Sequence, residues 1–273
     1  MTKNIKKYFF QFKLKNLNQR DTLKYLAKYS LFMKKSKPKE EFKTWGDVFD
    51  QFTSKTLYKM ITQGHFEGLE SPISIGKESN VFSAIKKDGT RVMVKIYRLE
   101  TCDFNRMFDY IKDDPRFIKL RRGKRNIIFT WVQREFRNLL KAREAGLNVP
   151  TPMAFTNNVL VLEYIGDEGY IAPKLKDGIP KNPNDFFEKI LTNVKKLYKA
   201  GLVHADLSAF NILNHNEIPV FIDFSQCSPI ESSRAMEFLQ RDIRNISSFF
   251  RKLGLKIDEE KIKEQILIQR QNP

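Results

Sequence analysis

A polar loop between two apolar runs, followed closely by a second carboxylate, is the feature that most constrains this chain. Residues 202–213 read LVHADLSAFNIL, with Asp206 and Asn211 in the loop, and residues 220–224 read VFIDF, with Asp223 at the end of a buried strand. Phosphoryl transfer needs such a set, because one carboxylate orients and deprotonates the acceptor while an amide oxygen and a second carboxylate hold a cation on the phosphates. A lone His-x-Asp motif could be an ordinary loop, but the spacing of all three residues indicates phosphoryl transfer.

A turn upstream of this loop could cover the phosphates of a nucleotide. Residues 73–82 read ISIGKESNVF and lie between apolar segments. Gly76 would let backbone N–H groups approach phosphate oxygens, and Ser74 would add a hydroxyl donor. The turn lacks the three glycines of the ordinary protein-kinase loop, so a plain hairpin turn is the alternative interpretation.

The next apolar segment carries a lysine at its centre. Residues 91–97 read RVMVKIY, and strand alternation places three aliphatic side chains on one face and Lys95, between Met93 and Tyr97, on the other. A lysine among apolar residues is costly unless a partner meets it, and phosphate oxygens or a carboxylate would do so. The pattern therefore predicts a nucleotide-binding lysine, with an edge-strand lysine that faces water as the alternative.

A helix further along offers the matching carboxylate. Residues 131–140 place apolar side chains at helical spacing, and Glu135 lies beside that stripe. We therefore expect Glu135 to pair with Lys95. The alternative is a solvated glutamate that pairs with an arginine or lysine one turn away.

The segment after this helix predicts the place where a base would bind. Residues 158–165 read NVLVLEYI, which indicates a buried strand. In a two-lobed kinase this position is the hinge. Backbone groups of Glu163 and Ile165 would then pair with adenine, and Leu162 would stand at the back of that pocket.

Taken together, these motifs resemble those of the RIO family of atypical serine/threonine protein kinases, and within it the first subfamily. The resemblance is collinear from about Thr56 to about Leu253. It is carried by SIGKESNV at residues 74–81, VKIY at 94–97, EFRNL at 135–139, LVHADLSAFNIL at 202–213 and IDFSQ at 222–226.

The resemblance implies an α+β, two-lobed, protein-kinase-like fold. We expect a basic helical N-terminal extension over residues 1–45 and a small β-rich N-lobe over residues 46–165, including a leading helix between Trp45 and Phe66. A trimmed, mainly helical C-lobe would follow over residues 166–273.

The resemblance also implies roles for the residues of the motifs. Lys95 would grip the α- and β-phosphates of ATP, covered by the turn with Ser74 and Lys77. Asp206 would be the base, and Asn211 and Asp223 would coordinate Mg²⁺, for which Mn²⁺ could substitute. Ser208 stands where ordinary protein kinases place a lysine, and the counterpart of Asp223 in the family can itself accept phosphate.

Some segments depart from the family pattern or are peculiar to it. Ala209 and Phe210 replace the usual Glu-Tyr pair, and the GKES stretch leans toward the second subfamily, which carries a winged-helix domain ahead of the kinase. Residues 101–126 are similar to the family's mobile insertion, which we expect to be ordered only by nucleotide or a partner.

The stretch after Asp223 favours an ATPase or a self-phosphorylating enzyme. Ordinary protein kinases continue with an activation loop, an Ala-Pro-Glu element and a large helical subdomain that docks peptides. Here residues 235–239 and 243–253 predict two short amphipathic helices, and no Ala-Pro-Glu element occurs. The chain should therefore phosphorylate itself, hydrolyse ATP, or act on a partner held elsewhere.

The charge of the chain suggests a polyanionic partner. Its formal net charge is +17, which favours RNA or a ribosomal particle, and the family resemblance implies a pre-ribosomal small subunit and its rRNA. Basic residues concentrate before the kinase-like segment and are interleaved with aromatic ones: Lys3, Lys6, Lys7, Tyr8, Phe9, Phe10, Phe12, Lys13, Lys15, Lys34, Lys35, Lys37 and Lys39. A second patch comprises Arg121, Arg122, Lys124 and Arg125.

Such a segment could stack on unpaired bases while its lysines contact phosphates. A short amphipathic helix packed on the N-lobe is the alternative, and Asp21 does cap a helical pattern that includes Leu23 and Leu26. Binding to a membrane surface is a weaker option.

Other features limit the class of protein. Cys102 and Cys227 have no metal-site spacing, which favours a reducing, cytoplasmic location. No apolar run predicts a signal peptide or a membrane span. We expect a monomer, in which His204 braces the catalytic loop.

Two alternatives to a RIO-type kinase stay open at this point. An aminoglycoside-type phosphotransferase shares the His-x-Asp loop but normally has a longer C-terminal region for its small substrate. A non-catalytic RNA-binding scaffold would use nucleotide only as a structural ligand.

Overall fold

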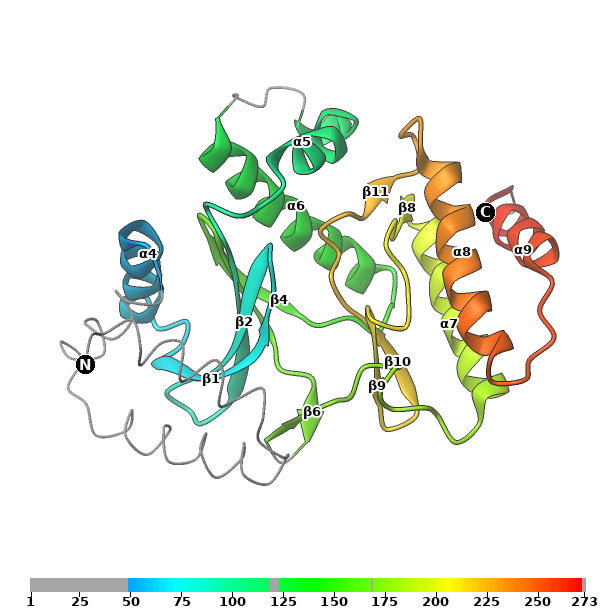
Figure 1. Cartoon of the computed structure of the whole chain (residues 1–273), viewed down its shortest axis with the longest axis horizontal. Helices are drawn as coiled ribbons and strands as arrows, with labels where there is room; N and C mark the ends of the chain where they lie inside the picture. The colour runs from blue at the N-terminus through cyan, green and yellow to red at the C-terminus, as the bar shows by residue number, and fades with distance from the viewer. Residues whose placement is uncertain (1–48, 118–122, 168, 272–273) are drawn as a thin grey trace, which may run out of the picture.

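An antiparallel sheet is followed by a mainly helical part in the computed structural model, which describes residues 49–117, 123–167 and 169–271 (Figure 1). The predicted N-terminal extension and the pair Arg121 and Arg122 lie outside these residues. The first part comprises α4 (Gln51–Thr62), β1 (Gly68–Ile75), β2 (Ser79–Ile85), β3 (Arg91–Tyr97), α5 (Phe104–Lys112), the 3₁₀ turn η1 (Pro115–Phe117), α6 (Lys124–Glu144), β4 (Pro152–Thr156) and β5 (Val159–Glu163).

The second part contains three long helices and several two- to four-residue strands. They are β6 (Gly166–Asp167), β7 (Tyr170–Ile171), α7 (Pro183–Lys199), β8 (Leu202–Val203), β9 (Ile212–His215), β10 (Ile218–Phe221), β11 (Ser228–Pro229), α8 (Ala235–Arg251) and α9 (Glu259–Gln271). In the described residues no helix is both long and apolar enough to span a bilayer.

The five-stranded sheet has the order β1-β2-β3-β5-β4, and every neighbouring pair is antiparallel. Strand β3 lies at its centre, and its register pairs Lys95 with Val81 on β2 and with Leu160 on β5. Lys95 therefore does not lie on an edge strand, which was the alternative interpretation. Because its side chain is buried, its charge needs a partner within the protein or a ligand.

The predicted alternation of this strand is confirmed. Val92, Val94 and Ile96 are buried in a cluster that includes Leu57 and Met60 of α4. The other face contributes its apolar side chains to the main core. Burying each large aliphatic side chain stabilises the fold by roughly 1.5–3 kcal/mol, so the sheet is held from both sides.

Helix α4 occupies the position predicted for the leading helix, and its start is capped. The Asp50 carboxylate accepts hydrogen bonds from the backbone N–H groups of Phe52, at 2.9 Å, and Thr53, at 3.0 Å. An N-cap carboxylate satisfies donors that have no partner within the helix.

The segment before α6 differs from expectation. Instead of a mobile insertion, its described part forms α5 and η1, and α5 buries Met107, Tyr110 and Ile111. These side chains belong to the main core, because the apolar residues of α5 recur at helical spacing. The described part of this segment is therefore helical and packed against the main core, which the expectation of a mobile insertion did not include.

The C-terminal helices also differ from the prediction. One continuous helix, α8, replaces the two short helices expected at residues 235–239 and 243–253, and α9 was not predicted. Residues 240–242, between the two predicted helices, are polar. Asp242 among them is in fact buried, at 2% exposure, and continues the inward stripe of α8.

Candidate active site

A buried ion pair joins the central strand to α6. Lys95 is 7% exposed, and its Nζ lies 2.8 Å from Glu135 Oε1, which is the contact predicted from the strand and helix patterns. The hydroxyl of Tyr97 donates to Glu135 Oε2 at 2.5 Å, a contact that the sequence analysis missed. Burial alone would lower the pKa of Lys95, but the carboxylates of Asp223 and Glu135 hold it well above its usual value.

Asp223 approaches the same lysine from the second part of the chain. Its Oδ1 lies 3.0 Å from Lys95 Nζ and accepts a hydrogen bond from Ser225 Oγ at 2.7 Å. Burial opposes ionisation, yet the Lys95 ammonium and the Ser225 hydroxyl lower the pKa of Asp223 to about 2. The lowered pKa keeps this carboxylate ionised, and its side chain, 40% exposed, is open to a ligand.

The backbone at Asp223 and at Ala205 is strained. Both have positive φ, 63° and 66°, which is uncommon for residues other than glycine and tends to occur at functional sites. At Ala205 the strain is held by Asp242, whose two carboxylate oxygens accept from the N–H groups of Ala205 and Leu207, each at 2.8 Å. Helix α8 thereby fixes the loop that carries Asp206.

Within this loop Asp206 and Asn211 are in contact. Asn211 Nδ2 donates to the backbone oxygen of Asp206 at 2.8 Å and to its carboxylate at 3.0 Å. Burial and the charge of Asp223 raise the pKa of Asp206 above its usual value. A carboxylate with a raised pKa accepts a proton more readily, as a general base must.

His204 lies beneath the loop rather than in the cleft. It is 2% exposed, and its Nε2 lies 3.1 Å from the carbonyl oxygen of Ile222. Burial lowers the pKa of His204 to about 4. A neutral, buried ring bonded to the residue before Asp223 fits the predicted bracing role.

A cleft of about 360 Å³ lies between the sheet and the second part of the chain. Six residues predicted for the site line it: Ser74, Lys95, Glu135, Leu162, Asn211 and Asp223. Its wall is otherwise mostly apolar, and the sequence analysis did not assign these residues to the site: Ile73, Val81, Met93, Leu139, Pro150, Ile171, Ala172, Pro173, Leu213 and Ile222. An apolar wall with a few convergent polar groups is typical of a small-molecule site.

The other predicted residues lie at or beyond the edges of the cleft. Lys77 is exposed, and its carbonyl accepts from Thr101 at 2.6 Å. Ser208 accepts from the N–H of Phe210 at 3.3 Å. The N–H of Glu163 donates to Thr151, and the carbonyl of Ile165 accepts from Ala172, each at 2.9 Å. Adenine contacts at these two hinge residues would therefore have to use the carbonyl of Glu163 and the N–H of Ile165.

The donor set fits a divalent cation held jointly by protein and phosphates. Because Asn211 Nδ2 faces Asp206, its side-chain oxygen is left for another partner, and Asp223 offers carboxylate oxygen beside it in the cleft. Among the described residues no group of three or more His, Cys, Asp or Glu side chains could hold a metal ion alone. Mg²⁺ characteristically takes one or two carboxylates and completes its shell with phosphate and water.

This combination of fold and site defines a protein-kinase-like phosphotransferase: an antiparallel sheet presents a lysine–glutamate pair, and a helical part supplies an Asp-Asn loop and a further Asp. A family model described as the RIO domain matches residues 80–262. The chain belongs to the RIO family and is a RIO-type serine/threonine-protein kinase.

Individual relatives agree with this assignment. The Rio1 kinase of Haloferax volcanii is 40% identical over 233 residues, covering 85% of this chain and 80% of the relative. The Rio1 kinase of Methanocaldococcus jannaschii is 43% identical, covering 78% of this chain and 73% of the relative. These similarities support the predicted first subfamily, the Rio1 type. They count against the alternative of an aminoglycoside-type phosphotransferase.

Solved structures support the fold. A Rio2 kinase from Chaetomium thermophilum, described as an ADP/Mg²⁺–phosphoaspartate complex, superposes with a TM-score of 0.60 at 23% sequence identity. The superposition covers 78% of this chain and 65% of the Rio2 chain. It shows a common kinase-like fold, an antiparallel N-terminal sheet followed by helices.

Proposed function

We propose that the protein binds Mg-ATP in the cleft, transfers phosphate to itself and hydrolyses ATP. The observation that carries this proposal is the convergence of Lys95, Glu135 and Asp223 within 3.0 Å contacts on a cleft that Asn211 also lines. Family membership supports it, and the described Rio2 complex contains ADP and Mg²⁺.

Each residue of the site has a proposed role. Lys95 would hold the α- and β-phosphates, with Glu135 keeping its ammonium in place. Ser74, Lys77 and the turn would cover the phosphates, and Ser208 would contact them from the loop.

The base and the cation would be held by other groups. Leu162 would pack against adenine, next to backbone groups of Glu163 and Ile165. Asn211 and Asp223 would hold Mg²⁺, which when bound neutralises charge on the phosphates. Asp206 would orient an acceptor hydroxyl or the attacking water and take its proton.

Asp223 is also the proposed acceptor of the phosphoryl group. One carboxylate oxygen would bond to the γ-phosphorus while the bond from that phosphorus to the β–γ bridging oxygen breaks, releasing ADP. Water would then attack the phosphorus, releasing phosphate and restoring the carboxylate. The ionised, 40% exposed carboxylate of Asp223 and the phosphoaspartate in the described Rio2 complex support this route.

Single-turnover incubation with γ-labelled ATP tests both steps. We expect a labelled, hydroxylamine-sensitive protein, and we expect Asp223→Ala and Asp206→Ala to abolish turnover. Asp88→Ala, which changes an exposed turn aspartate, is the matched control. Full turnover in both site variants would reject the proposal, and hydroxylamine-resistant label would reject the acyl-phosphate while retaining the kinase.

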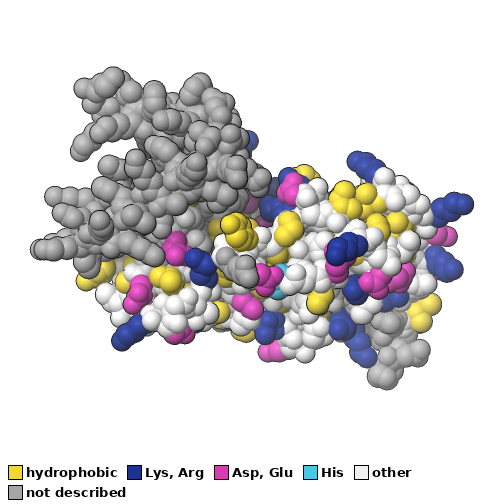
Figure 2. Space-filling model, turned by 90° about the horizontal axis from the view of Figure 1, so that it is seen from below, with side chains coloured by type: hydrophobic (Ala, Val, Ile, Leu, Met, Phe, Trp, Pro, Cys, Tyr) yellow, Lys and Arg dark blue, Asp and Glu magenta, His cyan; other side chains and the backbone are white. Residues whose placement is uncertain are grey.

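We further propose that the substrate particle is the maturing small ribosomal subunit. The net charge of +17 and the relationship to Rio1 kinases support an RNA-containing partner. On the face shown in Figure 2, Lys and Arg side chains of the described residues are interspersed with acidic ones. The segment richest in basic and aromatic residues lies before residue 49, outside the described residues.

Co-sedimentation tests this partner. We expect the protein to sediment with precursor small subunits and to leave them after ATP turnover, so an Asp206→Ala variant should accumulate on the particles. Normal particle maturation with that variant would instead favour the non-catalytic scaffold.

A further inference from the structure

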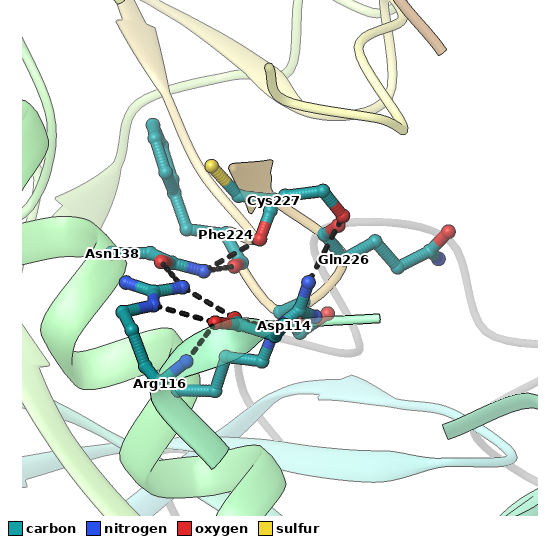
Figure 3. Close-up of polar contacts among 9 residues, drawn as sticks. Asp114, Arg116, Asn138, Phe224, Gln226 and Cys227 are labelled. Carbon is teal, nitrogen blue, oxygen red and sulfur yellow. Dashed lines mark hydrogen bonds and ion pairs between the residues drawn. The ribbon is translucent and has the colours of Figure 1, made fainter. Parts of the chain in front are cut away.

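A buried polar cluster contacts the backbone just after Asp223, and we call it the clamp. It consists of Asp114 and Arg116, which precede α6, and Asn138 on α6, all labelled in Figure 3, together with Arg134 on α6. Asp114 is 1% exposed, and Arg134 and Asn138 are fully buried. Groups of this kind are costly to bury unless they are all hydrogen-bonded, so their partners indicate what the cluster does.

The partners on one side are backbone groups just after Asp223. Arg134 Nη1 donates to the carbonyl of Ser225 at 2.7 Å. Asn138 Nδ2 donates to the carbonyls of Phe224, at 3.1 Å, and Cys227, at 2.8 Å. Three of the first four peptide units after Asp223 are thus held by two side chains of α6.

The partners on the other side come from the segment between α5 and α6. Arg116 donates to both carboxylate oxygens of Asp114, at 2.8 and 2.6 Å, and to Asn138 Oδ1 at 2.9 Å. Arg134 Nε donates to Asp114 Oδ2 at 3.0 Å. By occupying the oxygen of the Asn138 amide, Arg116 directs its NH₂ group toward the carbonyls.

The same turn of α6 also serves the nucleotide site. Glu135, the partner of Lys95, is the neighbour of Arg134 in the sequence. Helix α6 therefore fixes Lys95 through Glu135 and the segment after Asp223 through Arg134 and Asn138. One stretch of α6 is thus attached to both Lys95 and the segment after Asp223, two residues whose side chains lie 3.0 Å apart.

We infer that the clamp positions Asp223, and that Arg116 is its positioning residue on the α5–α6 side. In ordinary protein kinases, phosphorylation of the activation loop controls the placement of the corresponding Asp, whereas here side chains of a buried cluster hold the segment that follows it. Arg116 does not line the cleft and acts through Asn138 and Asp114. The expected effect on the Mg²⁺ requirement rests on the proposed function. The coupling between Arg116 and residues 224–229 does not depend on it.

Arg116→Ala tests the inference, since Arg116 is the clamp member that reaches the surface, with a side chain 27% exposed. Arg137→Ala is the matched control, because Arg137 is an exposed arginine of α6 that lies over Phe117 and makes no described hydrogen bond to residues 224–229. Three quantities are measured: backbone amide exchange in residues 224–229, the Mg²⁺ concentration for half-maximal ATP turnover, and KM for ATP at saturating Mg²⁺.

In Arg116→Ala we expect exchange to accelerate about tenfold and the half-maximal Mg²⁺ concentration to rise about fivefold, because the charge-assisted hydrogen bond that orients Asn138 is lost along with the two to Asp114. KM for ATP should change less than about twofold, because Lys95 keeps Glu135. Arg137→Ala should leave all three quantities unchanged. A merely structural role would alter thermal stability without raising the Mg²⁺ requirement.

Unchanged exchange in a folded Arg116→Ala protein would overturn the inference, as would equal effects of the two variants. If Arg116→Ala does not fold, Arg116→Lys is measured instead. Its amide exchange and half-maximal Mg²⁺ concentration should still rise above wild type, because one ammonium cannot serve Asp114 and Asn138 together. The rise should be smaller than the one expected for alanine, because one of the two contacts can be kept. If the wild-type protein turns over no ATP, the proposed function fails, while the exchange measurement still decides the coupling.

Discussion

Single residues at this site have several partners, and Asp223 is the clearest case. Its carboxylate binds Lys95 and Ser225, and its backbone adopts a positive φ. The sequence analysis predicted that Asp223 belongs to the site, because it ends an apolar run shortly after the loop with Asp206 and Asn211. It did not predict Ser225 as a partner, since a contact across a strained turn leaves no periodic pattern.

Replacing Ser225 tests that contact. We expect Ser225→Ala to lower ATP turnover at limiting Mg²⁺ roughly tenfold, because a hydrogen bond to a charged group contributes about 1.5–3 kcal/mol and fixes the orientation of the Asp223 carboxylate. At saturating Mg²⁺ the loss should be smaller. A titration of Mg²⁺ at fixed ATP measures both.

The control is Ser233→Ala, which changes an exposed serine before α8. It should behave as wild type. If Ser225→Ala has an unaltered Mg²⁺ dependence, the hydroxyl has no part in orienting Asp223.

His204 makes a pH-dependent contribution to stability. Burial lowers its folded-state pKa to about 4 from an ordinary value of 6.5, so below pH 6.5 the unfolded chain binds a proton that the folded protein does not. The stability that neutral His204 contributes is therefore present above pH 6.5 and is lost as the pH falls toward 4.

We expect the free energy of unfolding to fall between pH 7 and pH 5 by about 2 kcal/mol more in the wild type than in His204→Gln. Urea denaturation at the two pH values measures the difference, and other titrating groups cancel in the comparison. His65→Gln, a partly exposed position, should keep the wild-type difference. Equal pH dependence in wild type and His204→Gln would contradict a buried neutral ring.

Among the elements, strands and helices with strong periodicity were predictable, and those stabilised by buried polar groups were not. The alternation of β3 and the apolar stripe of α6 gave Lys95 and Glu135 and also their contact. Helix α8 was predicted as two short helices; Asp242, between them, is a carboxylate that faces inward and accepts from backbone N–H groups, which apolar periodicity does not reveal. Helix α5 was assigned to a mobile insertion because the resemblance, rather than its own periodicity, guided the interpretation.

Helix α9 offers a test at the level of an element. Ile266 is fully buried, whereas Ile268 on the same helix is 57% exposed. We expect Ile266→Ala to lower the free energy of unfolding by about 2–5 kcal/mol and Ile268→Ala by less than about 0.5 kcal/mol. Urea denaturation of both proteins measures this, and similar values would mean that α9 does not pack as described.

For the whole molecule, the cleft depends on residues that are far apart in the chain. Motifs identified Lys95, Glu135 and Asp223, because phosphate and metal chemistry demands particular residue types at fixed spacing, but they did not identify Lys174 and Asp177, which also line the cleft. Its apolar wall comes from both parts of the chain, including Val81, Met93 and Leu213. Such residues look like ordinary core residues in the sequence, so only the packing of the two parts assigns them to the site.

The charge of the whole molecule leads to a prediction about RNA. If the N-terminal basic and aromatic residues contact RNA, binding of a single-stranded RNA should weaken steeply as salt is raised, since each neutralised phosphate releases counterions. We expect a variant with Lys6, Lys7, Lys13 and Lys15 changed to glutamine to bind at least about tenfold more weakly and with a shallower salt dependence. Fluorescence anisotropy at several salt concentrations measures both effects.

The matched control removes the same charge from lysines of the described surface, namely Lys86, Lys87, Lys252 and Lys256. Because net charge falls equally in the two variants, a general electrostatic attraction would weaken binding equally in both. A local interface would spare the control variant. Equal losses would therefore reject an N-terminal RNA contact, and they would leave long-range attraction by a basic molecule as the only electrostatic contribution to binding.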